Sequence, residues 1–140
     1  MANLQDFKTF FEEIPVALIR IDAKTGEMLM ANRFAASLFG YESIEELKVN
    51  CKTIDCYSPE GLKLVSLLKK KRIVENYELE VKLPQRSLWV NAKLRYCPEN
   101  DFFEGAVIDI TDWVKCRNAN LPVLQEVAKK LDKRIAALAS

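Results

Sequence analysis

The sequence contains no histidine among its 140 residues. This absence excludes Ser-His-Asp and Cys-His catalysis, histidine-ligated haem, histidine-containing zinc sites and a histidine phosphoacceptor within the chain. Glycine is also scarce, and its four copies are never clustered, so no glycine-rich phosphate-binding loop can form. Adjacent acids such as Glu45 and Glu46 point about 100° apart on a helix and do not converge. We therefore expect a protein that is not an enzyme, with any catalytic activity in an output domain outside these residues.

An excess of one charge and a long apolar run are missing as well. The formal net charge is +1, so no field of one sign exists to attract nucleic acid or an anionic membrane. No window approaches the length of a membrane span, and the N-terminus has no apolar region of a secretory signal. The composition is that of one ordinary globular domain. We expect a cytoplasmic protein with no nucleic-acid partner and no membrane contact.

The four cysteines are few and far apart in the chain, at Cys51, Cys56, Cys97 and Cys116. Disulfides are rare in cytoplasmic proteins, so we do not expect any here. Cys51 and Cys56 have a spacing that could serve a metal or iron–sulfur site, whereas Cys97 and Cys116 are isolated. We predict no metal site and expect buried or idle thiols.

The first half of the chain predicts short elements with clear stop signals. We expect an amphipathic helix in residues 3–13 and strands in residues 15–22 and 27–31. A short helix capped by Asn32 follows in residues 32–39, and the capping-box pattern Ser43-Ile44-Glu45-Glu46 opens another. A longer helix begins at Ser58-Pro59, with serine as its N-cap. Its predicted buried stripe is Leu62, Val65 and Leu68. The cations in residues 69–72 suit the negative end of that helix.

The second half predicts an antiparallel sheet. Apolar and polar residues alternate in residues 76–83 and 88–96, which indicates a hairpin with a loop in residues 84–87. That loop places Glu78 opposite Lys93. A turn then returns the chain as a strand in residues 102–111. Because the helices are segregated from antiparallel strands, the expected fold class is α+β.

The C-terminal segment carries apolar residues at alternating spacings of three and four, which is typical of a coiled-coil seam. These residues are Leu121, Leu124, Ala128, Leu131, Ile135 and Leu138. Pro122 cannot sit in a continuous helix that runs from Asp112, because its ring clashes with the preceding turn. We expect a new helix near Asn120 or a kink there, with a hinge between Trp113 and Leu121. The alternative is a terminal helix that folds back on its own domain.

Four segments, in this order, are similar to motifs of the PAS domain family. They are Ile14–Asp22 for the opening strand, the Asn-x-x-Ala-Ala-x-x-Leu-x-Gly-Tyr pattern of Asn32–Tyr41, Glu80 with Trp89-Val90 for the central hairpin, and Gly105 with Asp109-Ile110-Thr111 for the closing strand. The resemblance implies a five-stranded antiparallel sheet with short helices on one face, plus N-terminal and C-terminal helices. It divides the chain into an N-terminal amphipathic helix (1–13), a PAS domain (14–113) and a C-terminal signalling helix (114–140).

PAS domains bind a small ligand or cofactor between the sheet and the helices, or mediate dimerisation. Carried over to this chain, the resemblance places a candidate pocket at Phe34, Leu38, Phe39, Ile54, Tyr57, Val81, Leu83, Leu88, Val90, Leu94 and Val107. The mostly apolar lining favours a hydrophobic or weakly polar guest. The alternative is that these side chains simply fill the core.

Two common cofactors are disfavoured. Asn50-Cys51-Lys52 resembles the photoactive Asn-Cys-Arg of the light-oxygen-voltage subfamily, but Asp55 stands where that motif has a glutamine. The amides that hold the flavin ring fall near Glu80, Val90 and Val107, and valine cannot hydrogen-bond the ring's polar edge. Haem would need cysteine or methionine as its axial ligand. The cofactor therefore stays unknown.

The resemblance also implies how a signal leaves the domain. It assigns the relay to Asp109, Ile110, Thr111 and Trp113, where the last strand meets the C-terminal helix. We expect Asp109 to pair with Lys93, with Arg95 or with a group of the exit segment; the alternative is a surface ion pair of little energetic value. The predicted homodimer interface combines both terminal helices through Phe7, Phe10, Phe11, Leu121, Leu124, Leu131, Ile135 and Leu138.

These inferences combine into one functional prediction, a homodimeric sensory module that relays a change in the sheet to a downstream signalling domain. The output classes that fit are histidine kinases, cyclases and chemotaxis transducers. One alternative is a protein-interaction module with a filled core and no ligand. Another is a metal or redox sensor that works through Cys51 or Cys56.

Overall fold

The computed structural model describes residues 3–50, 59–83 and 86–139 of the chain. The chain divides into two compact units, Met1–Asp109 and Ile110–Ser140. The first unit holds α1 (Leu4–Glu13), β1 (Ala17–Asp22), β2 (Met28–Ala31), α2 (Arg33–Leu38), α3 (Ile44–Asn50), α4 (Pro59–Lys71), β3 (Ile73–Lys82), β4 (Ser87–Cys97) and β5 (Phe102–Asp109). The second unit is one helix, α5 (Thr111–Ala139).

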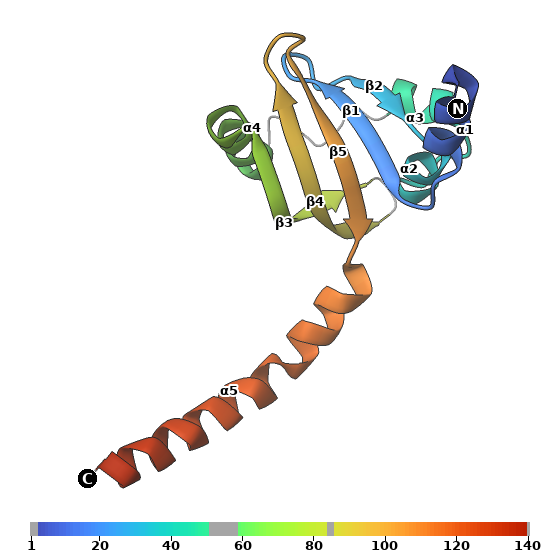
Figure 1. Ribbon diagram of the computed structural model, residues 1–140. Helices are drawn as coiled ribbons and strands as arrows, with labels where there is room; N and C mark the ends of the chain where they lie inside the picture. The colour runs from blue at the N-terminus through green and yellow to red at the C-terminus, as the bar shows by residue number, and fades with distance from the viewer. Residues whose placement is uncertain (1–2, 51–58, 84–85, 140) are drawn as a thin grey trace. The chain divides into compact units, whose positions relative to one another are not determined.

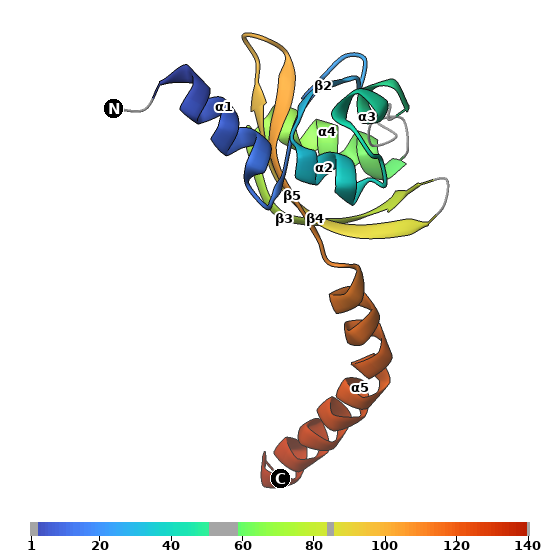
Figure 2. The same ribbon diagram turned by 90° about the vertical axis from the view of Figure 1, so that its right-hand side faces the viewer.

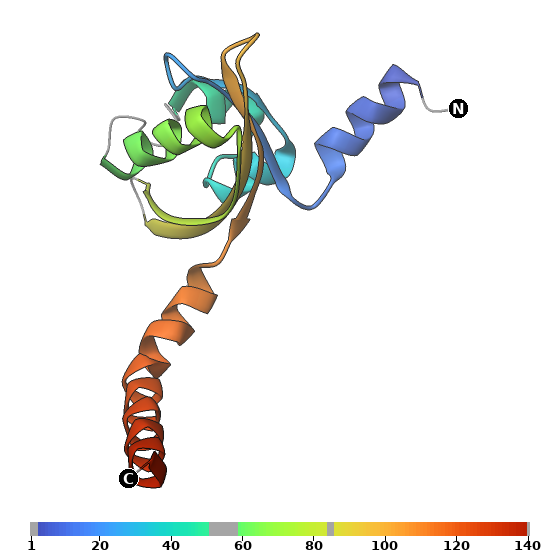
Figure 3. The ribbon, with the colours of Figure 1, turned by 60° about the vertical axis from the view of Figure 1, so that its left-hand side comes forward.

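The five strands form one antiparallel sheet in the order β2-β1-β5-β4-β3. The last strand in sequence, β5, is therefore the central strand in space (Figure 1). The sheet is curved, and α2, α3 and α4 lie on its concave side (Figures 2 and 3). This architecture confirms the expected α+β fold with an antiparallel sheet and helices at both ends of the chain.

The starts of α2 and α3 follow the predicted capping residues Asn32 and Ser43, whereas the cap of α1 was not predicted. Asn3 caps α1 in a reciprocal capping box with Asp6, and Asn32 caps α2 by accepting a hydrogen bond from the Ala35 N–H. The Ser43 hydroxyl accepts from the Glu46 N–H at 3.1 Å at the start of α3. These caps satisfy backbone donors that a first helical turn cannot pair internally. Ser58 lies outside the described residues.

The β3–β4 hairpin has a different register from the predicted one. Lys82 pairs with Ser87, so the connection is residues 83–86, and Glu78 faces Asn91 rather than Lys93. The shift is two residues, which leaves every side chain on its predicted face because strands have a period of two. A β-bulge between Val74 and Tyr77 then changes the pairing further along.

The buried stripe of α4 also differs from the prediction. Gly61, Leu64 and Leu68 are its buried residues, so the prediction of Leu68 is confirmed. Val65 is partly buried against the core, whereas Leu62 is 54% exposed. The helix is rotated so that its small residue and two leucines face the sheet. Leu62 therefore points to solvent, although the 3.6-residue period made it an equally good core candidate.

The core fills the space between the concave face of the sheet and the three helices. Its buried residues are Ala17, Ile19, Ile21, Met28, Ala31, Ala35, Ala36, Leu38, Phe39, Leu47, Leu64, Leu68, Val74, Leu79, Leu88, Val90, Ala92, Leu94, Phe103 and Val107. By contrast, α1 buries none of its residues, and Phe7 and Phe10 are 63% and 64% exposed. In the described part of the chain, no helix is both long and apolar enough to cross a membrane.

The C-terminal helix is continuous through Pro122, so the predicted alternative of a new start near Asn120 is wrong and the alternative of a bend in one helix remains. Helix α5 runs from Thr111 to Ala139 with Pro122 inside it. Proline lacks the N–H that would bond to the preceding turn, so it bends a helix without having to end it. The axis of α5 bends along its length, as Figure 2 shows.

Candidate functional site

A buried asparagine joins the start of α2 to the first strand of the sheet. Asn32 is fully buried, and its Oδ1 accepts hydrogen bonds from the N–H groups of Leu18 and Ala35 at 3.1 and 3.0 Å. Its Nδ2 donates to the Val16 carbonyl at 2.7 Å. One amide thus satisfies three backbone groups in a dry environment, which holds α2 against β1 beside the candidate pocket.

The structure brings most of the predicted pocket residues together in the core. The buried ones are Leu38, Phe39, Leu88, Val90, Leu94 and Val107. Val81 and Leu83 are partly buried and pack against them. Phe34 departs from the expectation because its side chain is 45% exposed. Ile54 and Tyr57 lie outside the described residues.

The core is tightly filled where α4 meets the sheet. A void of about 10 Å³ lies there, lined by Ile21, Gly61, Leu64, Val65, Leu68, Leu94 and Phe103. That volume is about the minimum for one water molecule, so no organic guest fits it without rearrangement. Of these residues, only Leu94 was a predicted pocket residue. The others were missed, although alternation within β1 and β5 would have indicated Ile21 and Phe103.

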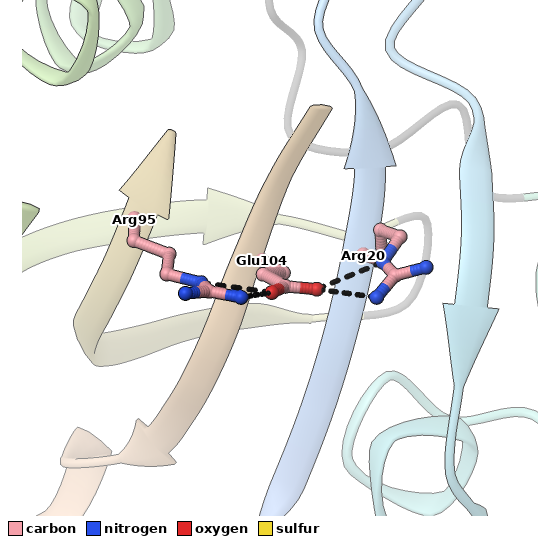
Figure 4. A network of polar contacts seen from close by, with 3 residues as sticks. All are labelled: Arg20, Arg95 and Glu104. Carbon is pink, nitrogen blue, oxygen red and sulfur yellow. Dashed lines mark hydrogen bonds and ion pairs between the residues drawn. The ribbon is translucent and has the colours of Figure 1, made fainter. Parts of the chain in front are cut away.

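The outer face of the sheet carries a charged network that the sequence did not predict. Glu104 of β5 lies between Arg20 of β1 and Arg95 of β4, and both are its directly paired cross-strand neighbours (Figure 4). Arg20 Nε donates to Glu104 Oε2 at 2.8 Å and Arg95 Nε donates to Oε1 at 2.8 Å. The Nη2 atoms of both arginines also contact the carboxylate. The Arg20 guanidinium lies 4.1 Å from the ring centroid of Phe102.

This network changes the acidity of its central carboxyl. Partial burial of Glu104 works against its ionisation, but hydrogen bonds from Arg95 and Arg20 outweigh that effect. The pKa of Glu104 is therefore held below its ordinary value. The network ties the central strand to both of its neighbours on the face opposite the core.

The expected partners of Asp109 are engaged elsewhere. Lys93 lies 3.5 Å from a Glu75 carboxylate oxygen, and Arg95 pairs with Glu104. Asp109 itself is paired in register with Val90, at the end of β5. Arg95 is opposite Glu104, five residues earlier on β5, and a strand rises about 3.3 Å per residue. Of the three partners expected for Asp109, Arg95 is thus excluded, and a group of the exit segment stays a prediction.

The second unit carries further predicted site residues, with Ile110 just before helix α5 and the others on it. Trp113 is 53% exposed, and the Arg117 guanidinium lies 4.4 Å from its ring centroid. The large seam residues are all exposed, namely Leu121, Leu124, Leu131, Ile135 and Leu138. The helix therefore presents an apolar stripe to solvent.

No metal site is found among the residues that the structure describes. They contain no group of three potential cysteine, aspartate or glutamate ligands that could hold an ion. Cys97 and Cys116 are free thiols, half-buried and exposed respectively. Cys51 and Cys56 lie outside the described residues.

The strand order, the helices on the concave face and the central last strand define a PAS-type fold. A family model described as a PAS domain matches residues 5–73, close to half of the chain. The chain is therefore similar to PAS domains over this part of its length. The match covers the elements from α1 to the first residue of β3.

Solved structures agree with this assignment at the level of the fold. An RNA-binding light-oxygen-voltage receptor matches with a TM-score of 0.65 and 19% identity, over 89% of this chain; this chain spans 37% of the receptor's length. A domain of a sensory box sensor histidine kinase/response regulator from Geobacter sulfurreducens matches with a TM-score of 0.60 and 18% identity, over 76% of this chain and 97% of that one. A PAS domain from Desulfitobacterium hafniense matches with a TM-score of 0.56 and 22% identity, over 72% and 98%. No curated protein matches the chain.

Proposed function

We propose that this chain is a sensory and signal-relay module with no catalytic activity of its own, and that it forms part of a larger signalling protein. One observation carries the proposal. The central strand of the sheet, β5, ends at Asp109, and α5 begins only two residues later at Thr111. Phe103 and Val107 of the same strand are buried in the core. A change in the core therefore acts on the strand that continues into the exit helix.

In this proposal, the signal is the binding of a small apolar ligand in the core or the exchange of a protein partner that alters the core. The buried residues of the candidate pocket are all apolar, and the one fully buried polar side chain of the described core, Asn32, is occupied by backbone groups. No polar side chain is thus left over among them to orient a charged ligand. This composition supports a hydrophobic or weakly polar guest.

The module is proposed to work as a homodimer. The stripe on α5 and the face of α1 with Phe7 and Phe10 leave large apolar side chains exposed in a single chain. Contiguous apolar patches on a monomer indicate contact surfaces, and a heptad seam is self-complementary. The second copy of this chain is the partner that the spacing fits.

The relay is tested by hydrogen exchange of α5 after matched changes in the core. Val107→Ala removes two methyl groups from β5, and Val74→Ala removes the same groups from the edge strand β3. We expect Val107→Ala to alter exchange in α5 and Val74→Ala to leave it unchanged. Adding Asp109→Ala to Val107→Ala should abolish the effect while the fold persists, since Asp109 is exposed. Equal effects of the two valine variants would overturn the relay.

The dimer is tested with adjacent residues of α5. Leu124 lies on the seam and Val123 does not, yet their exposures are similar at 57% and 63%. Leu124→Glu should dissociate the dimer in sedimentation equilibrium, because it places like charges in the apolar seam. Val123→Glu should leave it intact. A monomeric parent chain would contradict the dimer.

A second function is favoured by the tight core beneath α4. The small void there supports an interaction module whose core is filled and whose signal is the exchange of protein partners. This alternative predicts that no guest is released when the purified chain is unfolded. It also predicts that conservative changes in the pocket, such as Leu38→Met, leave function intact.

A further inference from the structure

The outward side of α4 combines exposed apolar surface with unpaired positive charge. One side of this helix carries Leu62, Lys63, Ser66, Leu67 and Lys70, at successive spacings of one, three, one and three, and we refer to them as the α4 outer face. They line a shallow hollow of about 460 Å³. The small Ser66 lies at the middle of the stripe, between two leucines and two lysines. A ridge of side chains from another helix fits a groove of this kind.

The charge on α4 is not balanced by its own domain. Four cations of the first unit outside α4 have carboxylate partners: Arg20 and Arg95 pair with Glu104, Lys93 with Glu75 and Lys24 with Asp101. Within the residues that the structure describes, no carboxylate forms an ion pair with Lys63, Lys69, Lys70 or Lys71. The helix dipole favours the lysines of the last turn, but it does not favour Lys63 near the start of the helix.

The fold accounts for only part of the apolar surface on this face, because Leu67 is partly buried and packs against the core whereas Leu62 does not. Leu62 is 54% exposed, while Leu64 and Leu68 of the same helix supply the contacts with the sheet. The exposed side chain of Leu62 therefore adds nothing to the packing of the core. A leucine ringed by cations does suit a contact in which both the apolar and the charged groups are covered at once.

We propose that the α4 outer face docks an acidic amphipathic helix of a partner protein. Carboxylates of that helix pair with Lys63 and Lys70, and one of its apolar residues covers Leu62. The proposal does not depend on the relay or on a guest in the core. Single-stranded nucleic acid is a poorer fit, because this face has no aromatic residue for stacking and no arginine. An anionic membrane is a poorer fit as well. Leu64 and Leu68 are buried in the core, so α4 has little exposed apolar surface that could insert into a lipid bilayer.

The test measures binding of the full 140-residue chain to a synthetic helix with glutamates at i and i+4 and leucine between them. The second probe is the same peptide with glutamine for every glutamate. The third is vesicles of phosphatidylglycerol and phosphatidylcholine in equal parts. We expect binding of the acidic helix, weakened by salt, and no binding of the glutamine peptide or of vesicles.

Variants locate the contact. Lys63→Gln with Lys70→Gln should raise the dissociation constant of the acidic helix about tenfold, as the loss of two exposed ion pairs implies. The control pair, Lys130→Gln with Lys133→Gln, removes the same charge from exposed positions of α5 and should change it less than about twofold. Leu62→Ser should weaken the acidic helix severalfold without lowering stability, because Leu62 lies outside the core. Equal effects of the two lysine pairs, or binding of vesicles but not of the helix, would overturn the proposal.

Discussion

At the scale of single residues, two glycines with positive φ have very different surroundings. Gly40 has a φ of +86° and nothing within 4 Å of the position where a Cβ would lie. Gly105 has a φ of +156°, and a Cβ there would lie 2.0 Å from the Lys93 carbonyl oxygen. The close pairing of β5 with β4 therefore depends on glycine at position 105.

This difference predicts unequal costs for the same substitution. Gly40→Ala should lower the free energy of unfolding by about 1–2 kcal/mol, the cost of left-handed backbone alone. Gly105→Ala should cost about 3 kcal/mol or more, because β4 and β5 must also separate. Urea unfolding of both variants measures the two values. Equal losses would show that β4 and β5 are not held as closely as the structure has them.

A pH dependence follows from the Arg20–Glu104–Arg95 network. The pKa of Glu104 is lower in the folded state than its ordinary value of 4.5, so its contribution to stability is present above that value and is lost as the pH falls through the lower, folded value. Glu104→Gln should therefore be less stable than the parent at neutral pH, and the gap should close in acid. Glu99→Gln, in the exposed turn before β5, should show no such gap. A gap for Glu104→Gln that persists at acid pH would contradict the ion-pair account.

At this scale, the sequence predicted hydrogen-bond partners that are close in the chain but not partners that are far apart in it. The Asn32 cap was predicted because its N–H partner is three residues away. The Arg20–Glu104 contact joins residues 84 positions apart, and no local pattern marks either of them. Only the pairing of β1 with β5 brings them together.

At the scale of elements, Pro122 weakens α5 without ending it. Pro122→Ala should restore a hydrogen bond and stabilise the helix by as much as about 3 kcal/mol. The measurement is the thermal loss of far-ultraviolet circular dichroism, which should shift upward. Asn120→Ala is the matched control, with an expected gain of about 0.5 kcal/mol. Equal shifts for the two variants would mean that the bend in α5 has another cause.

For the helices and strands, the sequence predicted the type and approximate bounds better than it predicted how they pair and pack. The type and approximate bounds of the hairpin strands followed from period-two alternation, whereas their register did not. Register depends on the connection at residues 83–86 and on the bulge between Val74 and Tyr77, both of which depend on backbone geometry. The choice of Leu64 over Leu62 as a core residue likewise depended on the sheet against which α4 packs.

At the scale of the whole molecule, the remaining question is what the core and the exposed apolar surfaces bind. Native mass spectrometry of the purified chain, with no ligand added, addresses both. We expect a dimer, because the α5 seam and α1 leave large apolar side chains exposed. A discrete extra mass that disappears on unfolding would identify the guest, and a bare dimer would favour the interaction module. A bare monomer would contradict the proposed assembly.

The sequence was enough to predict the fold class, the order of the elements, the caps at Asn32 and Ser43 and the apolar stripe on the last helix. These features depend on residues within a few positions of one another, where periodicity and capping chemistry act. The tertiary structure alone decided that β5 lies at the centre of the sheet, that Glu104 meets two arginines, and that Leu62 faces solvent beside Lys63. Those outcomes depend on which distant surfaces pack together, and packing energy belongs to pairs of elements rather than to any one segment.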